Sequence, residues 1–202
     1  MSRLVPTALL SATLVAAAGC GSSEKSAAPS GGYAASTSTV TTTTTRGIDP
    51  LAGADTTPVS GGAAGSETAL LERIGLGRHE GYDRVVFQFK NELPAYRVGY
   101  VQPPLKEDGS GNPVSVAGNA VVGVRMEPAS GFDLNTGEGV LVYKGPKRIE
   151  GSSAGTSVVQ ELVRTGDFEA VLSWAIGLSD QVDFRVTTAT SPARLIVDFR
   201  NH

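Results

Sequence analysis

The sequence has few of the residues that most often carry enzyme chemistry. Its 202 residues include one cysteine and two histidines, and His202 is the last residue. A single cysteine excludes a disulfide within the chain, so the folded part has to be stabilised by its core. There is no basic excess either, because 17 Lys and Arg residues face 20 Asp and Glu residues, and no basic stripe indicates nucleic acid binding.

Long hydrophobic runs are also missing. The longest apolar stretch near the start, residues 8–18, is about half of the ~20 residues that a membrane-spanning helix needs. It follows Arg3 and ends in small residues, which is typical of a secretory signal. Residues 1–19 are therefore predicted to be a signal peptide.

The position of the only cysteine predicts a lipid anchor. The run Ala17-Ala18-Gly19-Cys20 resembles the lipobox of bacterial lipoproteins, although Ala17 stands where a lipobox usually has Leu. The resemblance implies cleavage before Cys20, acylation of that cysteine by lipids such as palmitate, and a location on the outer side of the cell membrane. The alternative is a free or buried thiol in an ordinary secreted protein.

Residues 20–66 are predicted to be a disordered, lipid-anchored linker. They are rich in Gly, Ser, Thr and Ala, including five consecutive threonines at residues 41–45. Such a segment has too few apolar residues to offset the entropy of ordering. We expect a plain spacer, and O-linked sugars on the threonines are the alternative.

Residues 67–202 are predicted to form one all-β domain. Apolar and polar residues alternate at residues 83–90, 96–100, 170–178, 182–186 and 195–200, and less strictly at residues 120–126 and 158–164. Breaks rich in Gly, Pro and Asn separate these runs, and no segment has convincing helical periodicity. The pattern predicts an antiparallel β-sandwich or barrel of about eight or nine strands.

Several of these runs resemble the AMIN-like β domains of actinobacterial lipoproteins, which are related to the AMIN domains of cell-wall amidases and secretins. The resemblance rests on residues 77–87 (GRHEGYDRVVF), 94–101 (PAYRVGYV), 166–169 (GDFE), 174–178 (WAIGL) and 192–199 (PARLIVDF). It implies a β-sandwich without catalytic activity, and by analogy a role in targeting peptidoglycan. Fold transfers more safely than function along such a resemblance.

No catalytic or metal-binding set emerges from the residues themselves. His79-Glu80 begins like the zinc motif HExxH, but Asp83 stands where the second histidine would be. No serine lies in a Gly-x-Ser-x-Gly elbow, and the carboxylates Asp167, Glu169, Asp180 and Asp183 have no spacing that favours glycoside hydrolysis over ordinary surface positions. We expect no enzyme, no cofactor and no metal.

The aromatic residues give the better indication of a binding site. Tyr96 and Tyr100 share one face of a predicted strand, Tyr82 precedes another, and Arg84 and Arg97 lie near them in sequence. Tyrosines with arginines nearby can stack on sugar rings and bind their hydroxyls or carboxylates. These five residues are the candidate ligand-binding set.

The alternative places Tyr96 and Tyr100 in the core of the sandwich and makes Asp83-Arg84 a structural pair with another strand. Asp198 and Arg200 offer opposite charges for such a pair, but the sequence does not show the strand order. Trp174, on an apolar face, is predicted to be a core residue.

Two functions remain compatible with these features. The first is a non-enzymatic envelope lipoprotein whose domain binds peptidoglycan or another cell-wall polymer. The second is a protein–protein interaction module that docks or regulates an envelope enzyme or a secretion component. A small envelope hydrolase is disfavoured because the sequence offers no nucleophile–base pair.

Overall fold

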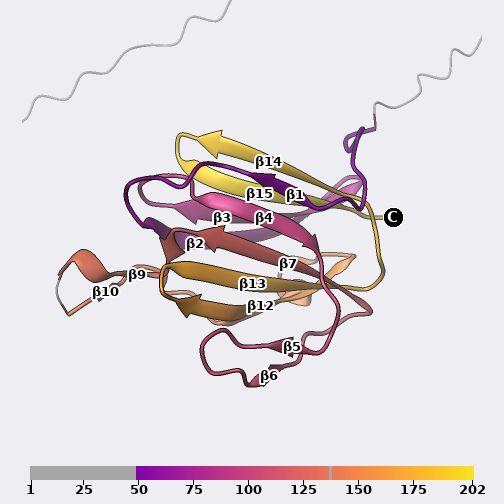
Figure 1. Cartoon of the computed structure of the whole chain (residues 1–202). Coiled ribbons are helices and arrows are strands. Elements are labelled where there is room, and N and C mark those ends of the chain that lie inside the picture. The colour runs from indigo at the N-terminus through magenta and orange to yellow at the C-terminus, as the bar shows by residue number, and fades with distance from the viewer. Residues whose placement is uncertain (1–48, 137) are drawn as a thin grey trace, which may run out of the picture. The chain divides into compact units, whose positions relative to one another are not determined.

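The computed structural model describes residues 49–136 and 138–202 (Figure 1). The predicted signal peptide, the predicted lipidation site Cys20 and the linker up to residue 48 lie outside this part. Within it, no helix is long and apolar enough to cross a membrane.

Two β-sheets form the body of the domain. The first has six strands in the order β1 (Val59–Gly61), β4 (Ala95–Tyr100), β7 (Ala120–Glu127), β13 (Val171–Leu178), β12 (Val159–Phe168) and β11 (Arg148–Glu150). The second has five in the order β14 (Phe184–Thr190), β15 (Ala193–Arg200), β3 (Tyr82–Phe89), β2 (Ala69–His79) and β8 (Ala129–Ser130). All pairings in both sheets are antiparallel, except that of β2 with β8.

Two small sheets and two short 3₁₀ helices lie outside this body. β5 (Leu105–Lys106) pairs with β6 (Pro113–Val114), and β9 (Phe132–Asp133) pairs with β10 (Val140–Leu141). The helices are η1 (Leu134–Thr136), between β9 and β10, and η2 (Gly151–Ala154), before β12. The β9–β10 hairpin projects from the sandwich (Figure 1).

The prediction of an all-β, predominantly antiparallel fold is confirmed. Eight strands in the described residues have six residues or more, which agrees with the predicted eight or nine. The seven strands of two or three residues were not predicted, because so short a segment carries no alternation to detect.

Alternation in the sequence explains how the core is filled. Val85, Phe87 and Phe89 of β3 are buried, while Val86 and Gln88 between them are only partly buried. Successive side chains of a strand point to opposite faces, so one face of each sheet supplies the core. Trp174 is 1% exposed and packs between Phe87 and Tyr143, as predicted for a core residue.

A buried carboxylate joins the two sheets at one end. Asp83, on β3, is fully buried, and its Oδ2 accepts hydrogen bonds from the backbone N–H groups of Ser157 (2.8 Å), Val158 (2.7 Å) and Val159 (3.1 Å). Its Oδ1 accepts one from Asn201 Nδ2 at 2.8 Å. The start of β12 in the six-stranded sheet is thereby held by β3 in the five-stranded sheet.

The folded domain begins earlier than predicted, so the expectation of a disordered linker is wrong for residues 49–61. β1 pairs with β4 over Val59–Gly61, and Leu51 is fully buried. Asp49 also accepts two hydrogen bonds of 3.1 Å from Arg200. One buried leucine and a three-residue strand anchor a segment whose composition is otherwise that of a linker.

Strand β2 was not predicted as a strand because its alternation is interrupted. Ala69, Leu70 and Leu71 are all buried, and the register with β3 shifts between Leu71 and Arg73. A β-bulge of this kind adds one residue to a strand, so the side-chain pattern before it is out of phase with the pattern after it.

Candidate binding groove on the six-stranded sheet

The five candidate residues lie at three separate places. Tyr82 and Arg84 are on the outer face of the five-stranded sheet, Tyr96 and Tyr100 pack against the core, and Arg97 lies on the outer face of the six-stranded sheet. The structure therefore brings Tyr82 and Arg84 together, and it does not assemble the five residues into one site.

Tyr96 and Tyr100 follow the alternative in which they face the interior. The Tyr100 hydroxyl donates a hydrogen bond to the Val182 carbonyl (2.7 Å) and accepts one from the Val182 N–H (2.9 Å). Its ring meets that of Phe184 edge-on, with 5.9 Å between centroids. Burial raises the pKa of this phenol, and the nearby Asp183 adds to the shift. The two tyrosines thus brace the sandwich and do not form an open stacking platform.

Tyr82 and Arg84 form a compact cluster with His79 and Asp198. The rings of Tyr82 and His79 stack at 4.8 Å, and the Arg84 guanidinium lies 5.1 Å from the Tyr82 ring centroid. Arg84 Nε and Nη2 donate to the fully buried Asp198 at 2.6 and 2.9 Å, and this bonding raises the pKa of Arg84. The structure thus follows the alternative in which Arg84 forms a structural ion pair, here with Asp198, and this pair commits the guanidinium to the fold.

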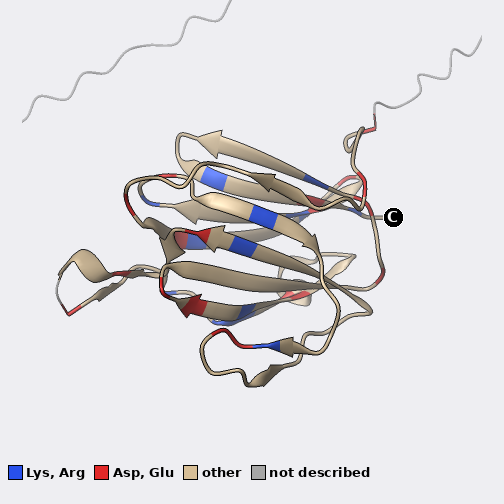
Figure 2. Cartoon of the chain, viewed as in Figure 1, with Lys and Arg blue, Asp and Glu red and all other residues tan. Residues whose placement is uncertain are grey.

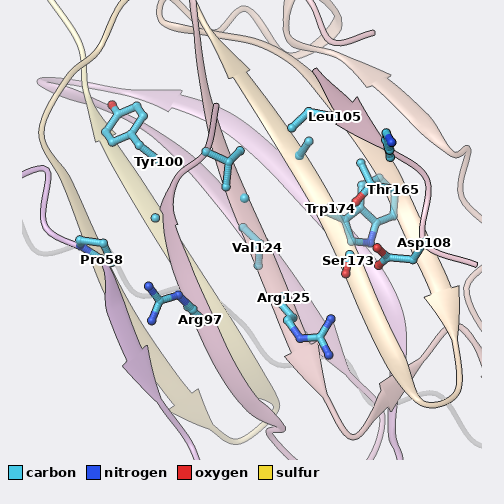
Figure 3. A pocket seen from close by; sticks show the side chains of 15 residues that line it. Pro58, Arg97, Tyr100, Leu105, Asp108, Val124, Arg125, Thr165, Ser173 and Trp174 are labelled. Carbon is cyan, nitrogen blue, oxygen red and sulfur yellow. The ribbon is translucent and has the colours of Figure 1, made fainter. Parts of the chain in front are cut away.

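A groove of about 340 Å³ lies on the outer face of the six-stranded sheet (Figure 3). Its floor has almost no side chains, because Gly99 of β4, Gly123 of β7 and Ala175 of β13 are paired in one row across three strands. The neighbouring row contains Arg97, Arg125 and Ser173. The two rows place a flat floor beside a cationic rim.

The glycines of this face lie where other segments cross the sheet. A Cβ at Gly99 would come within 2.9 Å of Pro58, and one at Gly123 within 2.9 Å of Val101. Pro58 precedes β1, and Val101 begins the excursion that contains β5 and β6 and supplies Leu105 and Lys106 to the opposite side of the groove. A side chain at Gly99 would push against Pro58, and one at Gly123 would force the Val101 side chain to move, so glycine allows both segments to lie close to the sheet.

Charge in the groove is mainly positive. Arg97 and Arg125 occupy directly paired positions on β4 and β7. Figure 2 shows a basic (blue) segment on each of these neighbouring strands. Arg125 Nη2 lies 3.0 Å from Glu127 Oε2, whereas Arg97 has no ion-pair partner among the residues that the structure describes. Lys106 and Asp108 line the same groove. Like charges at paired positions disfavour folding, so a bound anion would relieve the repulsion between the two arginines.

Sequence analysis identified Arg97 but missed Arg125, Lys106 and Ser173. The detectable signal was the set of glycines at outward-facing strand positions, Gly99 and Gly123, since glycine within a strand indicates a close approach of another segment. Strand order was also needed, because nothing in the sequence places β4 beside β7.

Two of the carboxylates considered for catalysis, Asp167 and Asp183, have structural partners. Asp167 accepts hydrogen bonds from Ser130 Oγ (2.8 Å) and from the Gly131 N–H (3.1 Å), and Asp183 lies 3.6 Å from Arg200. Across residues 49–136 and 138–202, no group of three or more His, Cys, Asp and Glu side chains is placed to hold a metal ion.

Comparison with known proteins gives one family match. The family model described as AMIN-like domain matches residues 69–201, which run from the start of β2 to just past β15. Neither the curated proteins nor the solved structures include a match.

Proposed function

The chain belongs to the AMIN-like domain family, and from that premise we propose that it is a membrane-anchored lipoprotein whose groove binds peptidoglycan or another cell-wall polymer. Family membership indicates a non-catalytic, cell-wall-associated binding module of the cell envelope. The lipid anchor, the polymer and the groove as its site are the parts that this proposal adds.

The observation that carries the proposal is an exposed cation, Arg97, at the rim of the groove. Arg97 has no acid partner among the described residues, and Arg125 and Lys106 line the same groove. Peptidoglycan stem peptides carry carboxylates, which guanidinium groups bind with two parallel hydrogen bonds.

Co-sedimentation with purified peptidoglycan sacculi tests the proposal. Residues 21–202, which keep the whole folded domain, are expected to pellet with sacculi, and Arg97→Ala is expected to lower the affinity by about tenfold, the loss of one good charged contact. Arg73→Ala is the matched control, because it removes an exposed arginine from the other sheet.

Two outcomes would contradict different parts of the proposal. If the unsubstituted protein pellets no more than an unrelated protein of similar charge, wall binding is excluded. If Arg97→Ala and Arg73→Ala weaken pelleting equally, the groove is not the site. Tyr82→Ala then tests the cluster of Tyr82, His79 and Arg84 as the alternative surface.

The anchor is tested separately. Cys20→Ala is expected to shift the protein from the membrane fraction to the soluble fraction or to stop its processing, because no acylated cysteine would then begin the mature chain. Mature protein that remains at the membrane after Cys20→Ala would rule out anchoring through this residue.

One observation favours the second candidate, a module that docks an envelope enzyme or secretion component. The β9–β10 hairpin exposes Leu134 (73%), Val140 (54%) and Leu141 (44%), and exposed apolar residues grouped in this way often mark protein contacts. Leu134→Ser with Leu141→Ser should abolish binding of such a protein and leave sacculus binding unchanged. Loss of sacculus binding in this double variant would instead assign the hairpin to the wall polymer.

A further inference from the structure

The edge strands of the two main sheets differ in length. Three of them, β1, β8 and β11, have two or three residues, whereas β14 has seven. Proteins usually protect long sheet edges, because unpaired backbone groups there can pair with another chain. β14 is thus the one long edge in these two sheets.

The hydrogen-bonding pattern shows which groups of β14 are free. Phe184 exchanges backbone hydrogen bonds with Asp55, at 2.9 and 3.3 Å, on the side away from β15. Donors and acceptors alternate sides along an antiparallel strand, so Val186, Thr188 and Thr190 also direct their N–H and C=O groups away from β15. Among the described residues, no strand pairs with β14 there after Asp55.

The composition of this edge does not oppose pairing. Val186, Thr187, Thr188, Ala189 and Thr190 contain no charge, proline or glycine, which are the residues that most often block edge pairing. Thr187, Thr188 and Thr190 are exposed. Valine and threonine also have high β propensity.

We propose that β14 is a homodimerisation edge, where a second copy of this chain adds its own β14 in antiparallel orientation. A two-fold axis at Thr188 places Thr188 opposite its counterpart and Val186 opposite Thr190 of the second copy. Each of these pairs joins residues whose backbone groups face outward, so every free N–H and C=O of the three residues obtains a partner.

The free backbone groups of β14 complement themselves, which is the reason to propose a second copy of this chain as the partner. The free groups at Val186, Thr188 and Thr190 are symmetric about Thr188, and Arg185 does not lie opposite its own counterpart in this register. Paired threonines across strands are favourable. The two five-stranded sheets would become one continuous sheet across the dimer.

Sedimentation velocity of residues 21–202, measured from about 5 to about 500 µM, tests the proposal. A concentration-dependent dimer is expected. Thr188→Lys, which sets like charges opposite each other, should weaken it by about tenfold or more. Thr187→Lys is the matched control and should change the dimer affinity little. The backbone groups of Thr187 face β15, and in this register a lysine at position 187 would not lie opposite another lysine.

Mixing two variants separates loss of pairing from loss of folding. Thr188→Lys and Thr188→Asp should each be monomeric with unchanged circular dichroism, and their mixture should form a heterodimer. Three results would overturn the proposal: a wild-type monomer throughout the concentration range, a dimer indifferent to both substitutions, or an edge that binds an added extended peptide while the protein stays monomeric.

Discussion

At the scale of single residues, Asp83 shows how one carboxylate can fix the relation of two sheets. Three backbone N–H groups and one side-chain amide converge on it where it is fully buried. Sequence patterns predicted β3 from the alternation of its apolar residues. They suggested only a structural pairing of Asp83-Arg84 with another strand and did not identify these partners, which lie more than 70 residues away in the chain.

Asp83→Ala is predicted to lower the free energy of unfolding by about 3 kcal/mol or more, since it leaves several buried donors unpaired. Urea denaturation of residues 21–202 measures the change. Asp83→Asn keeps the size and one acceptor oxygen, so it should cost less than Asp83→Ala. Equal stability of the Ala variant and the unsubstituted protein would contradict this role.

The raised pKa of Tyr100 predicts how the free energy of unfolding changes at alkaline pH. Because burial raises its pKa above the usual value of 10.0, the folded state favours the neutral phenol. The resulting stability is present below about pH 10 and is lost as the pH rises through the raised pKa. Tyr143, whose pKa is also raised by burial, acts in the same direction.

Thermal unfolding of Tyr100→Phe at several pH values checks this expectation. Near pH 7 the variant should be less stable by about 1 kcal/mol, because two hydrogen bonds to Val182 are lost. Between about pH 9 and about pH 11 its stability should fall less than that of the unsubstituted protein. Parallel pH profiles would show that Tyr100 is not responsible.

At the scale of elements, the sequence predicted the long strands better than the short ones. Alternation located the core strands β3, β4, β13 and β15, whereas β2 was missed because a bulge disturbs its pattern and β1 because it has three residues. The local sequence around β1 resembles a linker, and only contacts with distant residues show that it is folded.

Truncation tests the part played by this N-terminal segment. A chain that begins at Glu67 lacks β1 and the fully buried Leu51, so it should unfold at a lower urea concentration than residues 21–202. Leu51→Ala should alone cost about 3 kcal/mol, the usual size for a buried leucine. Leu134→Ala, at a highly exposed position, is the control and should change stability by less than about 0.5 kcal/mol.

At the scale of the whole molecule, the groove could not be predicted from the sequence because it depends on strand order. Arg97 and Arg125 become neighbours only when β4 pairs with β7, and Pro58 and Leu105 complete the walls from opposite sides. The family and the β-sandwich could both be predicted, because the family motifs and the alternation of apolar residues are visible within single segments of the sequence.

The local charge of the groove, and not the net charge of the chain, sets the salt dependence expected for wall binding. The chain has a formal net charge of -3, so its attraction to an anionic polymer would come from the local cations of the groove. Sacculus binding should therefore fall steeply between about 0.05 and about 0.5 M NaCl, where screening shortens to a few ångströms. Arg97→Ala should flatten this dependence, and an unchanged slope would contradict the electrostatic role.

The segment before β2 also determines how the domain would respond to mechanical load. A force applied at residue 49 acts first on the contact of Asp49 with Arg200, then on Leu51, and then on the pairing of β1 with β4. Pro58 lies within this path and forms one wall of the groove. With the anchor and wall binding proposed above, tension would move Pro58 before it reaches the rest of the sandwich, so the proposed binding of the polymer would weaken under load.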